Sequence, residues 1–361
     1  MILDQGEQIM PNQKTVLVHL GSGMGNMLMA TPMMEMLSKG GYKVDLCLQG
    51  ETPKVDTLFK RWPYIRTVAS DQNPFLDQQY NIYIYGFEVD GEPIHFKNFD
   101  NAVVLHPMWD WDKGFVLHSE IEFYSNLAKL IVPEVDIVTQ TSCSASERIF
   151  DDITEDTCVL IPGGGMQMII RKWAKYGELA QQIKDVAVVG LPADLNHSNR
   201  IIFPDWCKKI FGKTLQYQGK AWHFARHFAE RHDNEITFPE HVKNYIGKLS
   251  LEDTAALIKQ AGYVIGNDCG VTHLAVALGK PVFPILGPTS RRKVFPDFLS
   301  NVSIITANFD CQPCEENTKL GVWREDKSQC FCPYSIRCME DISVEKVLNH
   351  VGEKLNRDIK L

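Results

Sequence analysis

Strand-like apolar segments alternate with helix-like segments along both halves of this 361-residue chain. In the first half, TVLVHL at 15–20 is followed by a glycine-rich loop, a helix-like run and a second strand-like run at 43–49. After a polar and acidic stretch at 133–157, the alternation restarts with CVLI at 158–161. Short connections between alternating strands and helices are typical of doubly wound parallel sheets. We therefore expect an α/β protein with two Rossmann-like domains that face a cleft.

Composition and charge exclude several classes of protein. Hydrophobic residues make up 44% of the chain, which is too many for a disordered protein. The formal net charge of -8 disfavours nucleic-acid binding, because such domains carry a concentrated basic face. Apolar runs are interrupted well before the roughly 18 residues of a transmembrane helix. The N-terminal segment has acidic and amide residues where a signal peptide has a basic start, so a cytoplasmic location is expected.

The glycine-rich loop GSGMGN has the wrong spacing for a dinucleotide-binding loop. Its glycines stand at Gly21, Gly23 and Gly25, whereas a dinucleotide-binding loop reads G-x-G-x-x-G. A dehydrogenase also needs an acidic residue at the end of the second strand, where only Glu51 comes close. A nicotinamide-dependent oxidoreductase is therefore disfavoured.

A second glycine-rich loop follows the strand-like segment at 158–161. Gly163, Gly164 and Gly165 leave backbone N–H groups accessible to a ligand, and Arg171 and Lys172 follow shortly after them. This arrangement favours a site for a phosphorylated ligand. The alternative is an ordinary glycine turn beside a solvated basic pair.

A third motif, YVIGNDCGVTH, brings a carboxylate to the end of a buried strand. Asp268 follows this strand, and a helix is predicted to begin near Thr272. Ligands of open α/β sheets bind at such strand ends, where Asp268 can hold sugar or ribose hydroxyls. The backbone from Gly270 to His273 is suited to a diphosphate. Alternatively, Asp268 only caps the helix.

The motif GNDCGVTHLAVALGKPV, followed by GPT, resembles the signature of glycosyltransferase family 9, the bacterial ADP-heptose heptosyltransferases. The opening strand and loop LVHLGSGMGNMLMATP, the segment HSEIEFYSNLA and the PGGG loop with its RKW sequence are similar to further blocks of this family. The blocks occur in the family's order, from about residue 15 to about residue 345.

This resemblance implies a GT-B fold. Residues 1–150 are then a Rossmann-like domain on the acceptor side, and residues 151–345 a Rossmann-like domain that binds the nucleotide sugar and includes a Cys-rich finger at 311–338. A final helix at 346–361 packs back on the N-terminal domain.

The implied activity is transfer of heptose from ADP-heptose to a lipopolysaccharide or oligosaccharide core or to a protein, with inversion and no catalytic divalent metal. By the same likeness, Asp268, Gly270, Thr272 and His273 contact the ribose, sugar and diphosphate of the donor. Arg171 stands where the family has a phosphate-binding lysine. No nucleic-acid partner is expected, while a peripheral membrane contact and the oligomeric state are left open.

One residue of the opening loop departs from the family pattern. Asn26 stands where the family usually has the aspartate that acts as catalytic base, and an amide cannot accept a proton as a carboxylate does. Asn26 can still orient the acceptor, or the chain can be a catalytically weakened subunit that binds nucleotide sugars or supports assembly. The third alternative is a base from another residue, with four candidates: His118, Glu122, Glu120 and His19.

Five of the ten cysteines crowd into the segment 311–338. A C-x-x-C pair followed by further thiols has the spacing of structural zinc or a single iron ion, and some members of the family carry iron in a comparable C-terminal finger. The alternative is reduced structural thiols without metal. The candidate ligands are Cys311, Cys314, Cys330, Cys332 and Cys338.

Overall fold

The computed structural model divides the chain into two compact units. The first comprises Met1–Pro107 and Ile121–Thr139, and the second comprises Met108–Glu120 and Gln140–Leu361. The residues that the structure describes are 14–21, 23–49, 54–86, 99–104, 109–110, 114–115, 119–164, 171–195, 200–202, 205–211, 230–232, 235–314 and 337–359.

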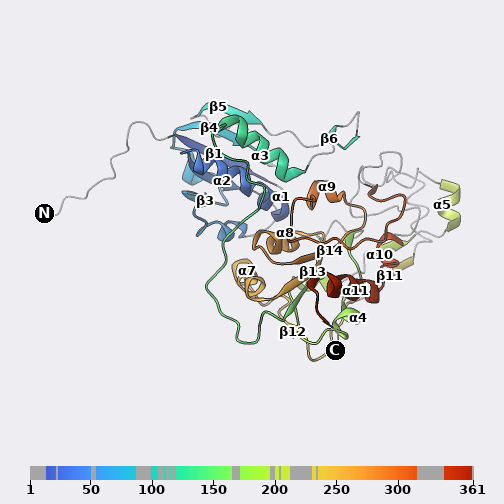
Figure 1. Ribbon diagram of the computed structural model, residues 1–361. Coiled ribbons are helices and arrows are strands. Elements are labelled where there is room, and N and C mark those ends of the chain that lie inside the picture. Colours follow the sequence, from blue (N-terminus) through green and yellow to red (C-terminus); the bar gives the residue numbers. More distant parts are fainter. Residues whose placement is uncertain are drawn as a thin grey trace. The chain divides into compact units, whose positions relative to one another are not determined.

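The first unit contains a five-stranded parallel sheet in the order β3-β2-β1-β4-β5 (Figure 1). The chain moves outward from β1 to β3 and then crosses back to pair β4 with β1, which is the doubly wound pattern. The strands are β1 (Thr15–Leu20), β2 (Lys43–Leu48), β3 (Thr67–Ala69), β4 (Tyr80–Tyr85) and β5 (Phe99–Val104).

Most helices of this unit follow the predicted pattern. The run after the opening loop forms two helices, α1 (Met24–Met29) and α2 (Thr31–Lys39), and α2 packs on β2. The helix α3 spans Glu120–Ile131. The sequence TPKVDTLFKRW was expected to be a helix, but only a 3₁₀ turn, η1 (Val55–Leu58), forms there. Trp62 precedes a proline, which disfavours helical backbone at Trp62 and limits how far a helix can extend here. A second 3₁₀ turn is η2 (Asn73–Phe75).

The second unit has a parallel sheet with the corresponding order, β12-β9-β8-β13-β14. Its strands are β8 (Cys158–Ile161), β9 (Val186–Val188), β12 (Lys243–Asn244), β13 (Tyr263–Asn267) and β14 (Val282–Ile285). The expected α/β class, with a doubly wound sheet in each half, is confirmed.

The remaining elements also belong mainly to the second unit. Two antiparallel pairs join β6 (Trp109–Asp110) with β7 (Gly114–Phe115) and β10 (Arg200–Ile202) with β11 (Glu230–His232). The helices are α4 (Tyr176–Ala180), the 3₁₀ turn η5 (Pro192–Leu195), α5 (Asp205–Phe211), α7 (Leu251–Gln260), α8 (Gly270–Ala277), α9 (Arg291–Val294), α10 (Arg337–Glu340) and α11 (Val344–Leu355).

The helix α11 contributes one face to the core of the second unit. Its buried residues Val344, Val347, Leu348 and Val351 belong to the core of the second unit, which also contains Trp173. The expectation that the C-terminal helix packs back on the N-terminal domain is not tested by this burial and stays a prediction. Amphipathic spacing predicts that a helix buries one face, but it does not identify the surface that covers this face.

Candidate functional site

The end of β13 holds two neighbouring segments in place. The side-chain oxygen of Asn267 accepts a hydrogen bond from the backbone N–H of Trp173 at 3.0 Å, and its amide nitrogen donates to the carbonyl of Pro162 at 2.8 Å. Asn267 is fully buried. The glycine-rich loop after β8 and the segment carrying Arg171 are thereby fixed against this strand.

Asp268, the next residue, is the centre of a buried polar cluster. Its carboxylate lies 3.1 Å from Nη1 of Arg171 and 3.5 Å from Nε2 of His273. The hydroxyl of Thr289 donates to Oδ2 of Asp268 at 2.7 Å. The sequence predicted the first three of these residues as site residues, and the fold brings them together. It gave no role to Thr289, although the GPT motif marked that position.

The Asp268 carboxylate is negatively charged in this cluster. Burial alone would raise the pKa of Asp268, but the neighbouring Arg171 guanidinium and the hydrogen bonds from His273 and Thr289 hold it well below its ordinary value. The carboxylate is therefore ionised at any working pH. An ionised carboxylate only accepts hydrogen bonds, so Asp268 can accept from the hydroxyls of a ligand.

The helix α8 begins directly beside this carboxylate. Its N-cap is Cys269, whose side chain makes no capping hydrogen bond. Asp268 therefore does not serve only as a helix cap, because its carboxylate contacts the side chains of Arg171, His273 and Thr289. His273 is stacked on Phe295, with ring centroids 4.6 Å apart and planes 10° apart, which fixes its imidazole toward Asp268.

Thr272 supports the turn between β13 and α8. Its hydroxyl donates to the carbonyl of Asn267 at 2.6 Å, and the side chain is fully buried. A Cβ at Gly266 would lie 2.5 Å from this hydroxyl, so only glycine permits the close approach. The Thr272 side chain thus shapes the site, whereas Gly270 places the first turn of α8 beside the carboxylate.

The second glycine-rich loop is packed against a buried lysine. A Cβ at Gly164 would lie 2.7 Å from Cγ of Lys172, and a Cβ at Gly163 would lie 3.0 Å from the Asp194 carboxylate. Lys172 is only 4% exposed, and burial lowers its pKa. The alternative of a solvated basic pair is therefore wrong for Lys172. Gly165 lies outside the described residues.

Two of the candidate acceptor-side residues, Asn26 and Glu122, belong to the first unit. Asn26 is the third residue of α1 and is half-buried, and its backbone N–H donates to the carbonyl of Gly23 at 3.1 Å. Glu122 is an exposed residue of α3. His118 lies outside the described residues.

The candidate metal ligands are described only in part. Cys314 and Cys338 are buried, Cys311 is half-buried, and Cys330 and Cys332 lie outside the described residues. Within the described part of the chain, no three histidine, cysteine or carboxylate side chains gather into a metal site. The Cys-rich finger therefore stays a prediction.

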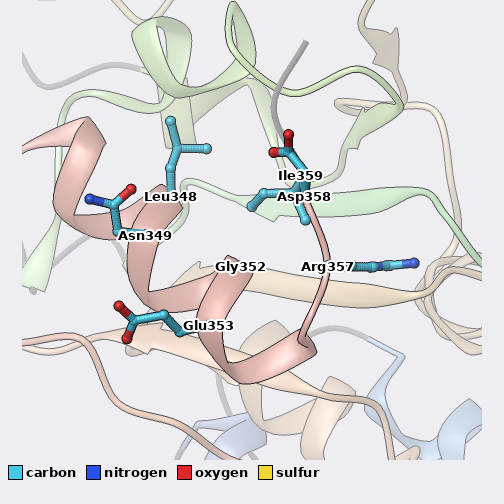
Figure 2. Close-up of a pocket in the computed structure, with 7 residues that line it drawn as sticks. All are labelled: Leu348, Asn349, Gly352, Glu353, Arg357, Asp358 and Ile359. Carbon is cyan, nitrogen blue, oxygen red and sulfur yellow. The ribbon is translucent and has the colours of Figure 1, made fainter.

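A separate hollow of about 320 Å³ lies between the last turns of α11 and the residues that follow it (Figure 2). Its polar lining includes Glu353 and Arg357. The Arg357 guanidinium pairs with Asp156 at 2.8 Å and lies over the ring of Tyr263, so it stabilises the C-terminal segment. None of the residues around Asp268 lines this hollow.

Residues 221–322, which include Asp268, His273 and Thr289, match the model of glycosyltransferase family 9 (heptosyltransferase). The resemblance to glycosyltransferase family 9 is confirmed. A curated relative, lipooligosaccharide heptosyltransferase 2 of Campylobacter jejuni, is 26% identical over 115 residues. This match spans about a third of either chain, 32% of each.

Solved structures of this family share the fold. The E. coli ADP-heptose LPS heptosyltransferase II is 14% identical, covers 95% of this chain and 98% of its own, and gives a TM-score of 0.57. A family 9 glycosyltransferase from Veillonella parvula is 13% identical with the same TM-score of 0.57, covering 95% and 97%. The iron-containing dodecameric glycosyltransferase TibC from enterotoxigenic E. coli is 14% identical with a TM-score of 0.54, covering 95% and 78%. The chain thus has the fold of family 9 glycosyltransferases.

None of the described helices is long and apolar enough to cross a lipid bilayer.

Proposed function

We propose that the chain is a glycosyltransferase that transfers heptose from ADP-heptose to a saccharide or protein acceptor, with inversion at the anomeric carbon. The buried Asp268 carboxylate, held by Arg171, His273 and Thr289 at the end of β13, carries this proposal. Three of these four residues lie in the segment that matches the family model.

The site supplies complementary groups for the two parts of a nucleotide sugar. The Asp268 carboxylate accepts hydrogen bonds from ribose or sugar hydroxyls. The first turn of α8 and the Arg171 guanidinium attract the diphosphate, because helix N-termini and guanidinium groups both favour phosphate oxygens. Without donor, Arg171 neutralises Asp268. When the donor binds, the Arg171 guanidinium donates hydrogen bonds to both the Asp268 carboxylate and the diphosphate.

On the acceptor side, the proposal assigns one residue that orients the acceptor and one that acts as base. Asn26 orients the acceptor hydroxyl, and His118 or Glu122 supplies the base. No catalytic divalent metal takes part, since the basic groups and the helix N-terminus neutralise the leaving diphosphate. Transfer takes place in the cytoplasm, where nucleotide sugars are made.

The first test is calorimetric titration of the full-length protein with ADP-heptose, ADP, UDP-glucose and GDP-mannose. We expect ADP-heptose to bind at least about tenfold more tightly than the UDP and GDP sugars, which is about 1.4 kcal/mol. Preference for another nucleotide would overturn the donor assignment but not the type of site. No binding of any of the four would contradict the proposal as a whole.

A second candidate function is a nucleotide-sugar-binding or assembly subunit without transfer activity. The amide at Asn26 favours it, because the family's expected base is missing at this position. Such a subunit would bind ADP-heptose in the calorimeter and would show no transfer to any acceptor.

We further propose that the cysteines at 311–338 bind one structural zinc or iron ion. The burial of Cys314 and Cys338 and the C-x-x-C spacing of Cys311 and Cys314 support this proposal. Elemental analysis of protein purified without chelator should find about one zinc or iron per chain. The Cys314→Ser variant should lose it, whereas the buried Cys158→Ser in β8 should retain it. A metal-free wild-type protein would leave these residues as reduced thiols.

A further inference from the structure

Four polar side chains form a connected network at the carboxyl ends of three neighbouring strands in the first unit. His19 lies near the end of β1, Gln49 follows β2, and Tyr83 is in β4. Nδ1 of His19 is 2.8 Å from the Tyr83 hydroxyl, and Nε2 is 2.7 Å from Oε1 of Gln49. The same Gln49 oxygen accepts a hydrogen bond from the Gln72 amide at 2.9 Å.

The protonation states in this network give each hydrogen bond a direction. Burial lowers the pKa of His19 to about 4 and raises the pKa of Tyr83 well above its ordinary value, so both groups are neutral. Since Oε1 of Gln49 can only accept, Nε2 of His19 carries the proton and donates to it. Nδ1 is then the acceptor of the Tyr83 hydroxyl.

These directions leave two complementary amide groups unused within the network. The Gln49 oxygen is used twice, so its NH₂ group is turned away from the network. The Gln72 NH₂ group is used by Gln49, so its carbonyl is also turned away. Neither the Gln49 NH₂ nor the Gln72 carbonyl has a hydrogen-bond partner within the residues that the structure describes, and both side chains are half-buried.

The segments that carry these amides are held firmly. The backbone N–H of Gln49 donates to the carbonyl of Leu20 at 2.8 Å, which continues the pairing of β1 and β2. On the Gln72 side, the Cys47 thiol donates to the carbonyl of Asp71 at 3.7 Å. Phe75, which is only 1% exposed, anchors the same turn in a core cluster. The two groups are therefore presented without the entropic cost of ordering free side chains.

We propose that Gln49 and Gln72 form a subsite for hydroxyl groups of a saccharide acceptor, oriented by His19 and Tyr83. A hydroxyl donates and accepts, so two adjacent sugar hydroxyls satisfy an outward NH₂ group and an outward carbonyl together. The subsite is uncharged, which suits a sugar ring rather than a phosphate or carboxylate. It lies at the carboxyl edge of the parallel sheet, where ligands of such folds bind. This inference rests on the proposed function and specifies the acceptor side of it.

The test uses a fluorescently labelled, deacylated lipooligosaccharide core as the probe, with binding measured by fluorescence anisotropy in the absence of donor. Gln49→Glu keeps the two hydrogen bonds that the side chain accepts from His19 and Gln72. It replaces the NH₂ group with a carboxylate oxygen and adds a negative charge, which the control below also adds. We expect the probe to bind about tenfold more weakly to this variant. Gln72→Met removes the carbonyl together with the NH₂ group that donates to Gln49, and it should weaken binding to a similar extent.

Gln78→Glu is the matched control, because it makes the same chemical change in the same unit. The Gln78 side-chain oxygen accepts from Arg66, a contact that a carboxylate retains, whereas its NH₂ group donates to the carbonyl of Pro74, a contact that is lost. It should change the affinity for the probe by less than about twofold, and ADP should bind all three variants as it binds the wild type.

The outcomes separate this inference from the proposed function. Unchanged probe affinity in both Gln49→Glu and Gln72→Met would overturn the subsite. A wild-type protein that binds ADP but not the core probe would also overturn it, while the donor proposal would stand. A wild-type protein that binds neither ADP nor the probe would instead contradict the proposed function itself.

Discussion

The Asp268→Asn variant should bind ADP-heptose about 100-fold more weakly than the wild-type chain in calorimetric titration. The substitution preserves the shape of the side chain and an acceptor for Thr289, but it removes a charge that is almost fully buried beside Arg171. Hydrogen bonds to a charged group contribute about 1.5–3 kcal/mol, and a factor of 100 in affinity is about 2.7 kcal/mol. The loss should appear in the affinity for the sugar nucleotide more than in the affinity for free ADP.

Asp341→Asn is the matched control for this prediction. Asp341 is also paired with an arginine, Arg337, at 2.7 Å, but its side chain is 39% exposed, and surface pairs contribute little. This control should bind ADP-heptose as the wild type does. Thermal unfolding of both variants would show whether they remain folded. If folded Asp268→Asn bound ADP-heptose within about threefold of the wild type, the carboxylate would have only a structural role.

The sequence predicted both sheets because their strands are short apolar runs followed by turn residues. Strands that are buried on both faces leave this signal, and β8 and β13 are buried throughout. The helix expected from TPKVDTLFKRW is only a 3₁₀ turn. Its apolar spacing indicated a helix, but the proline after Trp62 disfavours helical backbone at the end of this segment. The partner of α11 could not be predicted, since the spacing of its valines is satisfied by any apolar surface.

The candidate donor site was predictable only where its residues are close in sequence. Asp268 and His273 are five positions apart, so a strand followed by a helix is enough to bring them together. Thr289 reaches Asp268 across 21 positions, and the Asn267 contact to Trp173 spans 94 positions. Such contacts depend on the pairing of β13 with β14 and β8. The local sequence pattern does not reveal which strands pair. The burial of Lys172 is similar, because a lysine is normally read as a surface residue.

The second large effect is expected at the opening loop, where Asn26→Asp should raise the rate of heptose transfer about 100-fold or more. A positioned general base contributes about 10²–10⁴ in rate, and a carboxylate supplies the proton acceptor that an amide lacks. Asn26 is half-buried near the start of α1, where a negative charge is favourable, so the variant should fold. The measurement is the single-turnover rate of transfer from ADP-heptose to a deacylated lipooligosaccharide core.

Asn73→Asp, at an exposed position in the 3₁₀ turn η2 of the same unit, makes the same chemical change away from the opening loop and should leave the rate unaltered. A gain confined to Asn26→Asp would mean that the donor and acceptor sites are intact and that only the base has been lost. If the wild type transfers heptose and Asn26→Asp is no faster, a different residue must be the base, and variants of His118 and Glu122 would identify it. If ADP-heptose binds and neither protein transfers heptose, the missing carboxylate is not the limiting defect. The same fold then serves to bind the nucleotide sugar, and the second candidate function takes the place of the first.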